Sequence, residues 1–302
     1  MLCISLKYTF LLCSLLGAGI FSTLFAQSKI QLPAHFELHG HRGARGLFPE
    51  NSIYGFVETA KMGVKVLEMD VVVSKDQQII VSHEPYLNPT ICLLENGAKI
   101  KGKGKQYNLY QMTAAEIQRF DCGTKKHPRF PEQKKLTVHK PTLNQVVAAI
   151  DKLDTSIRFN IEMKASPKGD DLYHPVPAVF AQLLYQTLVE LNIKDRVTIQ
   201  SFDVRCLQEM RALDENVPLV LLVENFLSVE RNLVALGFKP AVYSPYYKLL
   251  KKETVVQLHK AGIKVIPWTV NDANAMKALI DLQVDGIITD YPDRFYELIG
   301  KP

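Results

Sequence analysis

Short apolar runs alternate with helical patterns from Phe36 to the end of the chain. Such runs, rich in Val and Ile, predict β-strands, and their regular alternation with helical segments predicts parallel strands joined by helices. Eight of these units favour a closed (β/α)8 TIM barrel. The predicted strands are residues 36–41, 65–70, 157–163, 196–202, 217–223, 241–244, 263–268 and 285–289.

The segments between these runs carry helix signals. Apolar residues between Val176 and Leu191 recur at three- and four-residue spacing, which predicts an amphipathic helix. The stretch from Thr142 to Gln145 has the form of a capping box and predicts a helix that runs to about Leu153. Further helices are predicted at residues 53–62, 204–213, 249–261 and 273–282.

One long segment, residues 84–141, breaks this alternation. It is irregular, and it contains a lysine-rich stretch at 99–105 and a second basic stretch at 124–135. Long irregular segments inside a compact domain are usually functional, so we interpret this one as an insertion over the mouth of the barrel. Its lysines have two interpretations, a solvated surface or the attraction of an anionic substrate.

The N-terminus has the pattern of a secretory signal peptide. Lys7 precedes an apolar run from Tyr8 to Ile20, and small residues end at Ala26. This pattern predicts a leader of residues 1–26, a single domain of residues 27–302 and an exported protein, periplasmic or secreted. The alternative is an uncleaved membrane anchor, but the segment is near the minimum length of a spanning helix. We expect no stable membrane insertion.

The net charge indicates which classes of partner to expect, and the cysteines indicate a possible disulfide. The formal net charge of +5 suits small acidic molecules and is far from a nucleic-acid-binding signature, so no nucleic-acid partner is expected. Cys92 and Cys122 lie in the same irregular segment and are better candidates for a disulfide than Cys206. The alternative is that all three are buried thiols.

Carboxylates occupy positions that a barrel interior normally gives to Val, Ile and Leu. Side chains alternate along a strand, so Glu68 and Asp70 share the face opposite their apolar neighbours. Asn160, Glu162 and Lys164 share a face in the same way. Glu162 alone fits an ion pair with Lys164 equally well. Three inward carboxylates together favour a metal site, and oxygen ligands indicate Mg²⁺ or Ca²⁺ rather than zinc.

Two histidines and a glycine-rich loop accompany these carboxylates. His41 and His83 each lie where a strand meets a loop, and a histidine pair is suited to proton transfer near neutral pH. The loop GHRGARG, residues 40–46, has glycines at three-residue spacing, which fits neither GxGxxG nor GxxxxGK[ST]. A nucleotide-binding loop is therefore disfavoured, although Arg42 can offer a bidentate fork to a phosphate.

Several of these stretches occur together and in order. They are HRG, PEN (49–51), the Glu68 and Asp70 pair, His83, NIEMK, QSFD (200–203), WTVN (268–271) and DGIITDYP (285–292). In this respect the sequence resembles the glycerophosphodiester phosphodiesterases, which are TIM barrels of the phospholipase-C-like kind. The resemblance extends from about His39 to Pro292.

The resemblance implies a metal-dependent hydrolase with defined site residues. It would convert glycerophosphodiesters, such as glycerophosphocholine or glycerophosphoethanolamine, to sn-glycerol 3-phosphate and an alcohol. His41 and His83 would be the acid/base pair. Glu68, Asp70 and Glu162 would bind Ca²⁺ or Mg²⁺, whereas Arg42 and Lys164 would hold the phosphate. The family usually has Asp after the second histidine, and this chain has Glu84, which bears on the orientation of His83.

Other interpretations of the site stay open at this point. Phe202 and Trp268, at strand ends, are candidate walls for the glycerol or head-group side, or ordinary core aromatics. A non-catalytic head-group-binding protein would need the metal and phosphate residues but not both histidines. A phosphodiesterase for another phospholipid head group would need an exposed apolar rim, whereas residues 84–141 are mostly polar and basic.

Overall fold

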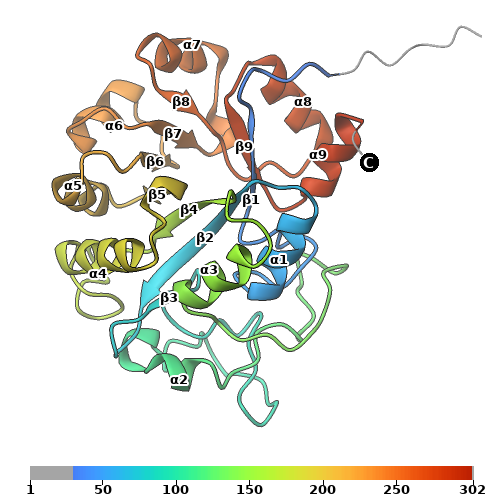
Figure 1. Ribbon diagram of the computed structural model, residues 1–302, viewed down its shortest axis with the longest axis vertical. Coiled ribbons are helices and arrows are strands. Elements are labelled where there is room, and N and C mark those ends of the chain that lie inside the picture. The colour runs from blue at the N-terminus through green and yellow to red at the C-terminus, as the bar shows by residue number, and fades with distance from the viewer. Residues whose placement is uncertain (1–29, 301–302) are drawn as a thin grey trace, which may run out of the picture.

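Eight parallel strands close into a barrel in the computed structural model, which describes residues 30–300 (Figure 1). They pair in the order β8-β7-β6-β5-β4-β2-β1-β9. Backbone hydrogen bonds from Asp285 N to Val265 O (2.9 Å) and from Ile288 N to Pro267 O (3.0 Å) join the two ends of this order. The predicted TIM barrel is confirmed, whereas the predicted leader of residues 1–26 lies outside the described residues.

The strands match the eight apolar runs closely. They are β1 (Glu37–Gly40), β2 (Val66–Val73), β4 (Arg158–Met163), β5 (Val197–Ser201), β6 (Leu219–Val223), β7 (Val242–Pro245), β8 (Lys264–Val265) and β9 (Gly286–Thr289). A ninth strand, β3 (Ile79–Val81), pairs antiparallel with β2.

Helices surround the barrel (Figure 1). They are α1 (Ile53–Lys61), α3 (Leu143–Asp151), α4 (Pro177–Glu190), α5 (Val204–Leu213), α6 (Val229–Leu236), α7 (Lys252–Lys260), α8 (Ala273–Asp281) and α9 (Pro292–Leu298). The capping box predicted at Thr142 and Gln145 is present. The helix predicted from residue 249 begins later, at Lys252, because Tyr247–Leu249 form a separate 3₁₀ turn.

Two helices, α6 and α9, lie where the sequence pattern predicts none. Both are short, and their ends carry local signals. Ser228 caps α6, Gly237 ends it in the left-handed conformation, and Pro292 occupies the first turn of α9. In so short a helix the apolar stripe covers about two turns, so capping residues are the stronger signal.

The barrel interior has an apolar half and a polar half. Outward side chains such as Leu67, Met69 and Ile161 belong to the main core between the barrel and the helices. Inside the barrel, Val220, Val242, Ile266 and Ile288 form a small apolar cluster. The inward positions of β1, β2, β4 and β5 are polar instead, and they are His39, Glu68, Asp70, Asn160, Glu162 and Gln200. The polar half positions the site described below.

The irregular segment after β3 builds a second, smaller core. The segment contains a 3₁₀ turn (Leu109–Gln111) and the short helix α2 (Ala114–Ile117). Leu87, Leu109, Ile117 and Phe120 pack with Val72 of β2 and Ile80 of β3. Cys92 and Cys122 form a disulfide within this core, as the sequence favours, and Cys206 is a free buried thiol.

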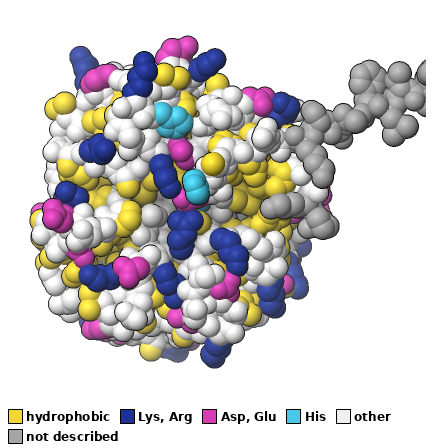
Figure 2. Space-filling model, turned by 45° about the horizontal axis from the view of Figure 1, so that its top comes forward, with side chains coloured by type: hydrophobic (Ala, Val, Ile, Leu, Met, Phe, Trp, Pro, Cys, Tyr) yellow, Lys and Arg dark blue, Asp and Glu magenta, His cyan; other side chains and the backbone are white. Residues whose placement is uncertain are grey.

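Charged side chains are spread over the surface. Figure 2 shows Lys and Arg side chains on one face of the molecule with Asp and Glu side chains among them. This mixture agrees with the small net charge of the chain. Among residues 30–300, no helix combines the length and the hydrophobicity needed to cross a bilayer.

Candidate active site

A cavity of about 180 Å³ opens at the carboxyl ends of the barrel strands. Eight of the nine residues predicted from the sequence line it, and they are His41, Arg42, Glu68, His83, Glu162, Lys164, Phe202 and Trp268. The ninth, Asp70, is fully buried and contacts Arg42 and Lys164 of this lining. Residues 85–141 contribute nothing to the lining, so their position over the barrel mouth stays a prediction.

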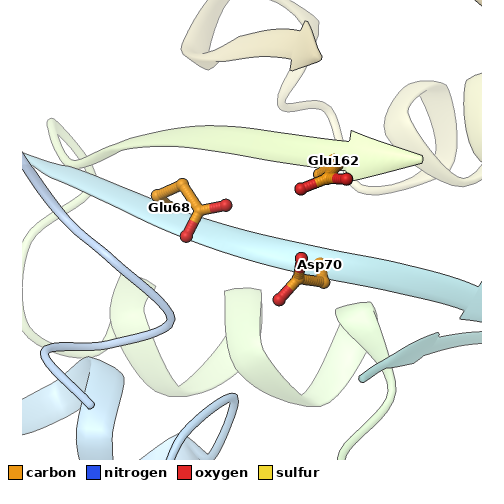
Figure 3. A group of neighbouring side chains, drawn as sticks. All are labelled: Glu68, Asp70 and Glu162. Atoms are coloured by element: carbon orange, nitrogen blue, oxygen red, sulfur yellow. The ribbon is translucent and has the colours of Figure 1, made fainter. Parts of the chain in front are cut away.

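Three carboxylates converge in this cavity from two neighbouring strands (Figure 3). Glu68 and Asp70 lie on β2, and Glu162 lies on β4 as the direct neighbour of Asp70 in the parallel register. One oxygen from each lies within 4.8 Å of the others. The alternation that the sequence predicts is therefore what brings the three groups together.

Two cations compensate part of this negative charge. Arg42 Nε lies 3.1 Å from Asp70 Oδ2, and Lys164 Nζ lies 2.6 Å from Glu162 Oε1 and 3.6 Å from Asp70 Oδ1. The amide of Asn51 also donates to Asp70 Oδ2 (2.8 Å). Three buried carboxylates thus face two cations, the buried Arg42 and the partly buried Lys164, which leaves one negative charge uncompensated within the group.

The protonation of the carboxylates follows from these neighbours. Burial raises the pKa of Glu68 well above its usual value, and the charges of Asp70 and Glu162 raise it further. Burial also raises the pKa of Glu162. For Asp70, burial acts in the same direction, but the charges of Arg42, His83 and Lys164 together outweigh it, so the pKa of Asp70 lies well below the usual value. Without a further cation, repulsion and burial therefore favour a proton on one of the glutamates.

The loop from His41 to Ser52 is held in place by unusual backbone conformations. Arg42, Gly43 and Ala44 all have positive φ, and the Arg42 N–H donates to Glu68 Oε2 (2.9 Å). A Cβ on Gly43 would lie 2.9 Å from the backbone nitrogen of Phe56. Gly43 therefore allows the loop to approach α1 closely.

His41 is oriented by a residue that the sequence analysis does not single out. Its Nδ1 lies 2.5 Å from Asp290 Oδ1, which also accepts from Arg45 Nε (2.8 Å). Asn271 donates to the other oxygen of Asp290 (2.7 Å). Because Asp290 is an acceptor for all three groups, Nδ1 of His41 carries the proton, and Nε2 presents its lone pair to the cavity.

Burial and nearby cations keep His41 neutral. Burial lowers the pKa of His41 to about 4, and the Arg45 cation contributes to this shift. The pKa of Asp290 is lowered by His41 and Arg45, which outweigh its own burial. The only sequence signal for Asp290 is its place in DGIITDYP, directly after β9.

His83 has a carboxylate partner of its own. Its Nδ1 lies 2.9 Å from Glu84 Oε1. Burial would raise the pKa of Glu84, but the hydrogen bond and charge of His83 outweigh it and lower the pKa. The longer Glu at this position therefore still reaches the neighbouring imidazole, and Nε2 of His83 is left without a bond to Glu84.

A chain of buried polar groups runs from Glu68 down through the barrel. Gln200 Nε2 donates to Glu68 Oε1 (2.8 Å), and Asn160 Nδ2 donates to Gln200 Oε1 (3.0 Å). Asn160 Nδ2 also lies 3.3 Å from Nδ1 of His39, whose Nε2 lies 3.4 Å from Glu37 Oε2. This chain satisfies the polar half of the interior and fixes the Glu68 carboxylate. Gln200 and His39 are further residues that the sequence analysis leaves without a role.

Two aromatic side chains also line the cavity. The rings of Phe202 and Trp268 meet edge to face with centroids 5.3 Å apart, and Trp268 Nε1 donates to the Ser244 carbonyl (2.9 Å). Phe202 is 42% exposed, which favours a contact surface over an ordinary core position.

The residues fit a divalent cation. Asp70 Oδ1 is buried and accepts no hydrogen bond from any described residue. Metal–oxygen distances of about 2.0–2.6 Å place ligand oxygens about 4–5 Å apart across a cation, close to the separation seen here. An all-oxygen donor set suits Mg²⁺ or Ca²⁺. The three carboxylates could therefore hold a metal ion, which would change the net charge of the group from −1 to +1.

A TIM barrel with carboxylate, imidazole and basic groups at the carboxyl ends of its strands has the make-up of a hydrolase for anionic esters. The sequence pattern of the "Glycerophosphoryl diester phosphodiesterase family" matches residues 41–294. The chain belongs to this family, and it is a hydrolase of the glycerophosphodiester phosphodiesterase class.

The similarity to known proteins covers most of the chain. A glycerophosphodiester phosphodiesterase from Caldanaerobacter subterraneus is 31% identical over 261 residues, covering 86% of this chain and 96% of the relative. A family structure from Silicibacter pomeroyi has a TM-score of 0.80 at 28% identity, covering 87% of this chain and 93% of its own. An Oleispira antarctica phosphodiesterase shares the fold, with a TM-score of 0.71 at 22% identity, covering 89% and 98%.

Replacing Lys164, which is partly buried, tests the charge balance. Lys164→Met removes one of the two cations that face three buried carboxylates. Breaking a buried pair costs roughly 3 kcal/mol, so in chelator we expect a loss of about that size in the free energy of unfolding. Mg²⁺ or Ca²⁺ should recover part of the loss. Urea unfolding measures both values.

Lys168→Met is the matched control, because Lys168 is exposed and pairs with no carboxylate among the described residues. Equal stability of Lys164→Met and the unchanged chain in chelator would contradict the charge balance described here.

Proposed function

We propose that this protein hydrolyses glycerophosphodiesters, such as glycerophosphocholine and glycerophosphoethanolamine, to sn-glycerol 3-phosphate and an alcohol with a divalent cation. The observation that carries the proposal is the pairing of two imidazoles with three carboxylates in one cavity. His41 and His83 each have Nδ1 next to a carboxylate. A binding protein would not need such a pair.

Related proteins support sn-glycerol 3-phosphate as the product of the proposed reaction. The Oleispira antarctica phosphodiesterase was solved in complex with the product sn-glycerol-3-phosphate. A glycerophosphodiester phosphodiesterase from Bacillus subtilis is 31% identical over 265 residues, covering 85% of this chain. The cavity of this chain has the basic groups that such a product requires, since Arg42 and Lys164 both line it.

The carboxylates and the basic side chains of the cavity would bind different groups, the cation and the phosphate. Glu68, Asp70 and Glu162 would hold the cation, which when bound neutralises phosphoryl oxygens and lowers the pKa of a nearby hydroxyl. Arg42 and Lys164 neutralise the remaining phosphate charge. Phe202 and Trp268 line the cavity and would bound the side that takes the glycerol or head group.

The two histidines move the protons. In the route that the family resemblance implies, the glycerol 2-hydroxyl attacks phosphorus, and its proton passes to Nε2 of His41 as the new P–O bond closes a cyclic phosphate; direct attack by water on the diester is the alternative route. The bond to the head-group oxygen breaks, and Nε2–H of His83 protonates that oxygen. In the second step water attacks phosphorus and gives a proton to His83. The ring P–O bond then breaks, and the 2-oxygen regains its proton from His41.

We further propose that the protein is exported to the periplasm or secreted. The disulfide between Cys92 and Cys122 supports an oxidising compartment. The leader pattern in residues 1–26 supports the same destination.

Metal and histidine dependence test the proposal together. Turnover of glycerophosphocholine and glycerophosphoethanolamine should fall to background in chelator and return with Mg²⁺ or Ca²⁺. His41→Ala and His83→Ala should each lower kcat by about 10²-fold or more, the usual contribution of general acid–base catalysis. His259→Ala, on the surface of α7, is the control. No turnover with either metal, or unchanged kcat in both variants, would refute the proposal.

Asp290→Asn tests how His41 is positioned. The amide would favour the wrong tautomer of His41, and kcat should fall by roughly 10²–10⁴-fold while KM changes little. The pH profile should change as well, because the carboxylate next to His41 is lost. Asp272→Asn is the matched control, since Asn also caps α8. An Asp290→Asn enzyme with normal kcat would show that Asp290 does not orient a catalytic imidazole.

A further inference from the structure

The apolar wall of the cavity continues onto the outer surface of the barrel mouth. Phe202, in the loop after β5, is 42% exposed although it lines the cavity. The loop after β6 begins with Glu224, which also lines the cavity, and goes on to Phe226 and Leu227. These two side chains are 95% and 51% exposed. Phe226 is two residues from Glu224, so it lies within about 7 Å of the cavity rim by chain length.

The Phe226 loop is held in this outward conformation. Leu227 N donates to Asn225 Oδ1 (2.9 Å), and Asn225 Nδ2 donates to Asn232 Oδ1 (3.0 Å) on α6. A nearly fully exposed Phe in an anchored loop is unusual, because burial of such a ring is favourable. Leu172, in the loop after β4, is 49% exposed at the same end of the barrel.

The lysine-rich stretch of residues 99–105 adjoins the loop after β4. Lys105 Nζ lies 5.7 Å from the ring centroid of Tyr173, and Asn108 Nδ2 donates to the Leu172 carbonyl (2.7 Å). Lys103 and Lys105 are exposed. Exposed apolar side chains beside exposed lysines complement an anionic lipid surface, where rings enter the interface and lysines meet head groups.

We propose that the loops after β4, β5 and β6, with the lysine-rich stretch, dock on an anionic phospholipid surface. Docking of this kind is peripheral and needs no spanning helix. It would bring the cavity to glycerophosphodiesters that retain one acyl chain, that is, to lysophospholipids. The choice of substrate rests on the function proposed above, whereas docking itself does not. The apolar rim absent from residues 84–141 is thus supplied by the barrel loops.

Vesicle binding tests docking directly. The unchanged chain should co-sediment with vesicles of phosphatidylglycerol and phosphatidylcholine more strongly than with phosphatidylcholine alone. The double variant Phe226→Ser, Leu227→Ser should bind the mixed vesicles about tenfold more weakly. Lys103→Glu with Lys105→Glu should remove the preference for the anionic vesicles.

Val234→Ser is the matched control. Val234 is 79% exposed but lies in the last turn of α6, away from the barrel mouth. Every variant carries the same N-terminal segment, so any contribution of that segment to binding is equal in all of them. Binding of the double variant equal to that of the unchanged chain, or an equal loss in Val234→Ser, would overturn the proposal.

Activity separates this proposal from the proposed function. The double variant should hydrolyse soluble glycerophosphocholine normally, because neither residue lines the cavity. Its turnover of lysophosphatidylcholine held in mixed vesicles should fall about tenfold, in parallel with binding. If the double variant and the unchanged chain hydrolyse lysophosphatidylcholine in these vesicles at equal rates, the proposal is also overturned. Failure of every variant to cleave glycerophosphocholine would instead refute the proposed function, and the binding comparison would still decide docking.

Discussion

The burial of Glu68, Asp70 and Glu162 in one small space is the constraint on which the rest of the site depends. Like charges in a low-dielectric interior repel strongly unless cations and hydrogen bonds compensate them. Arg42 and Lys164 supply two positive charges, and one negative charge is left over. A divalent cation would more than offset it and give the group a net positive charge. The same arrangement would draw a phosphate toward the two basic side chains.

The scaffold is built to support this burial. The polar half of the barrel interior gives Glu68 a hydrogen bond from Gln200, which is itself held by Asn160. In the loop after β1, Arg42 has a positive φ, and its backbone N–H donates a hydrogen bond to the same carboxylate. The other interior half is apolar and packs against Trp268, so charged and hydrophobic side chains line one cavity.

The sequence predicted the barrel because eight apolar runs have the length and spacing of buried parallel strands. It also placed the carboxylates, since strand alternation sends Glu68 and Asp70 to one side. It could not assign Asp290, because its role depends on β9 lying next to β1 in the closed barrel, a contact 249 positions apart in the sequence. Gln200 was missed for a similar reason, since its partner Glu68 lies two strands away. Helices α6 and α9 were missed because they are too short for a clear apolar period.

Direct measurement of metal binding is the sharpest test of the central claim that the three carboxylates form a cation site. Calorimetric titration of the chelator-treated protein with Mg²⁺ or Ca²⁺ should show saturable binding of a single cation per chain. Asp70→Asn should weaken this binding by roughly 100-fold, because it removes a ligand charge. Glu224→Gln, an exposed acid on the cavity rim, should leave it unchanged. Absence of binding, or equal affinity in Asp70→Asn, would contradict the account.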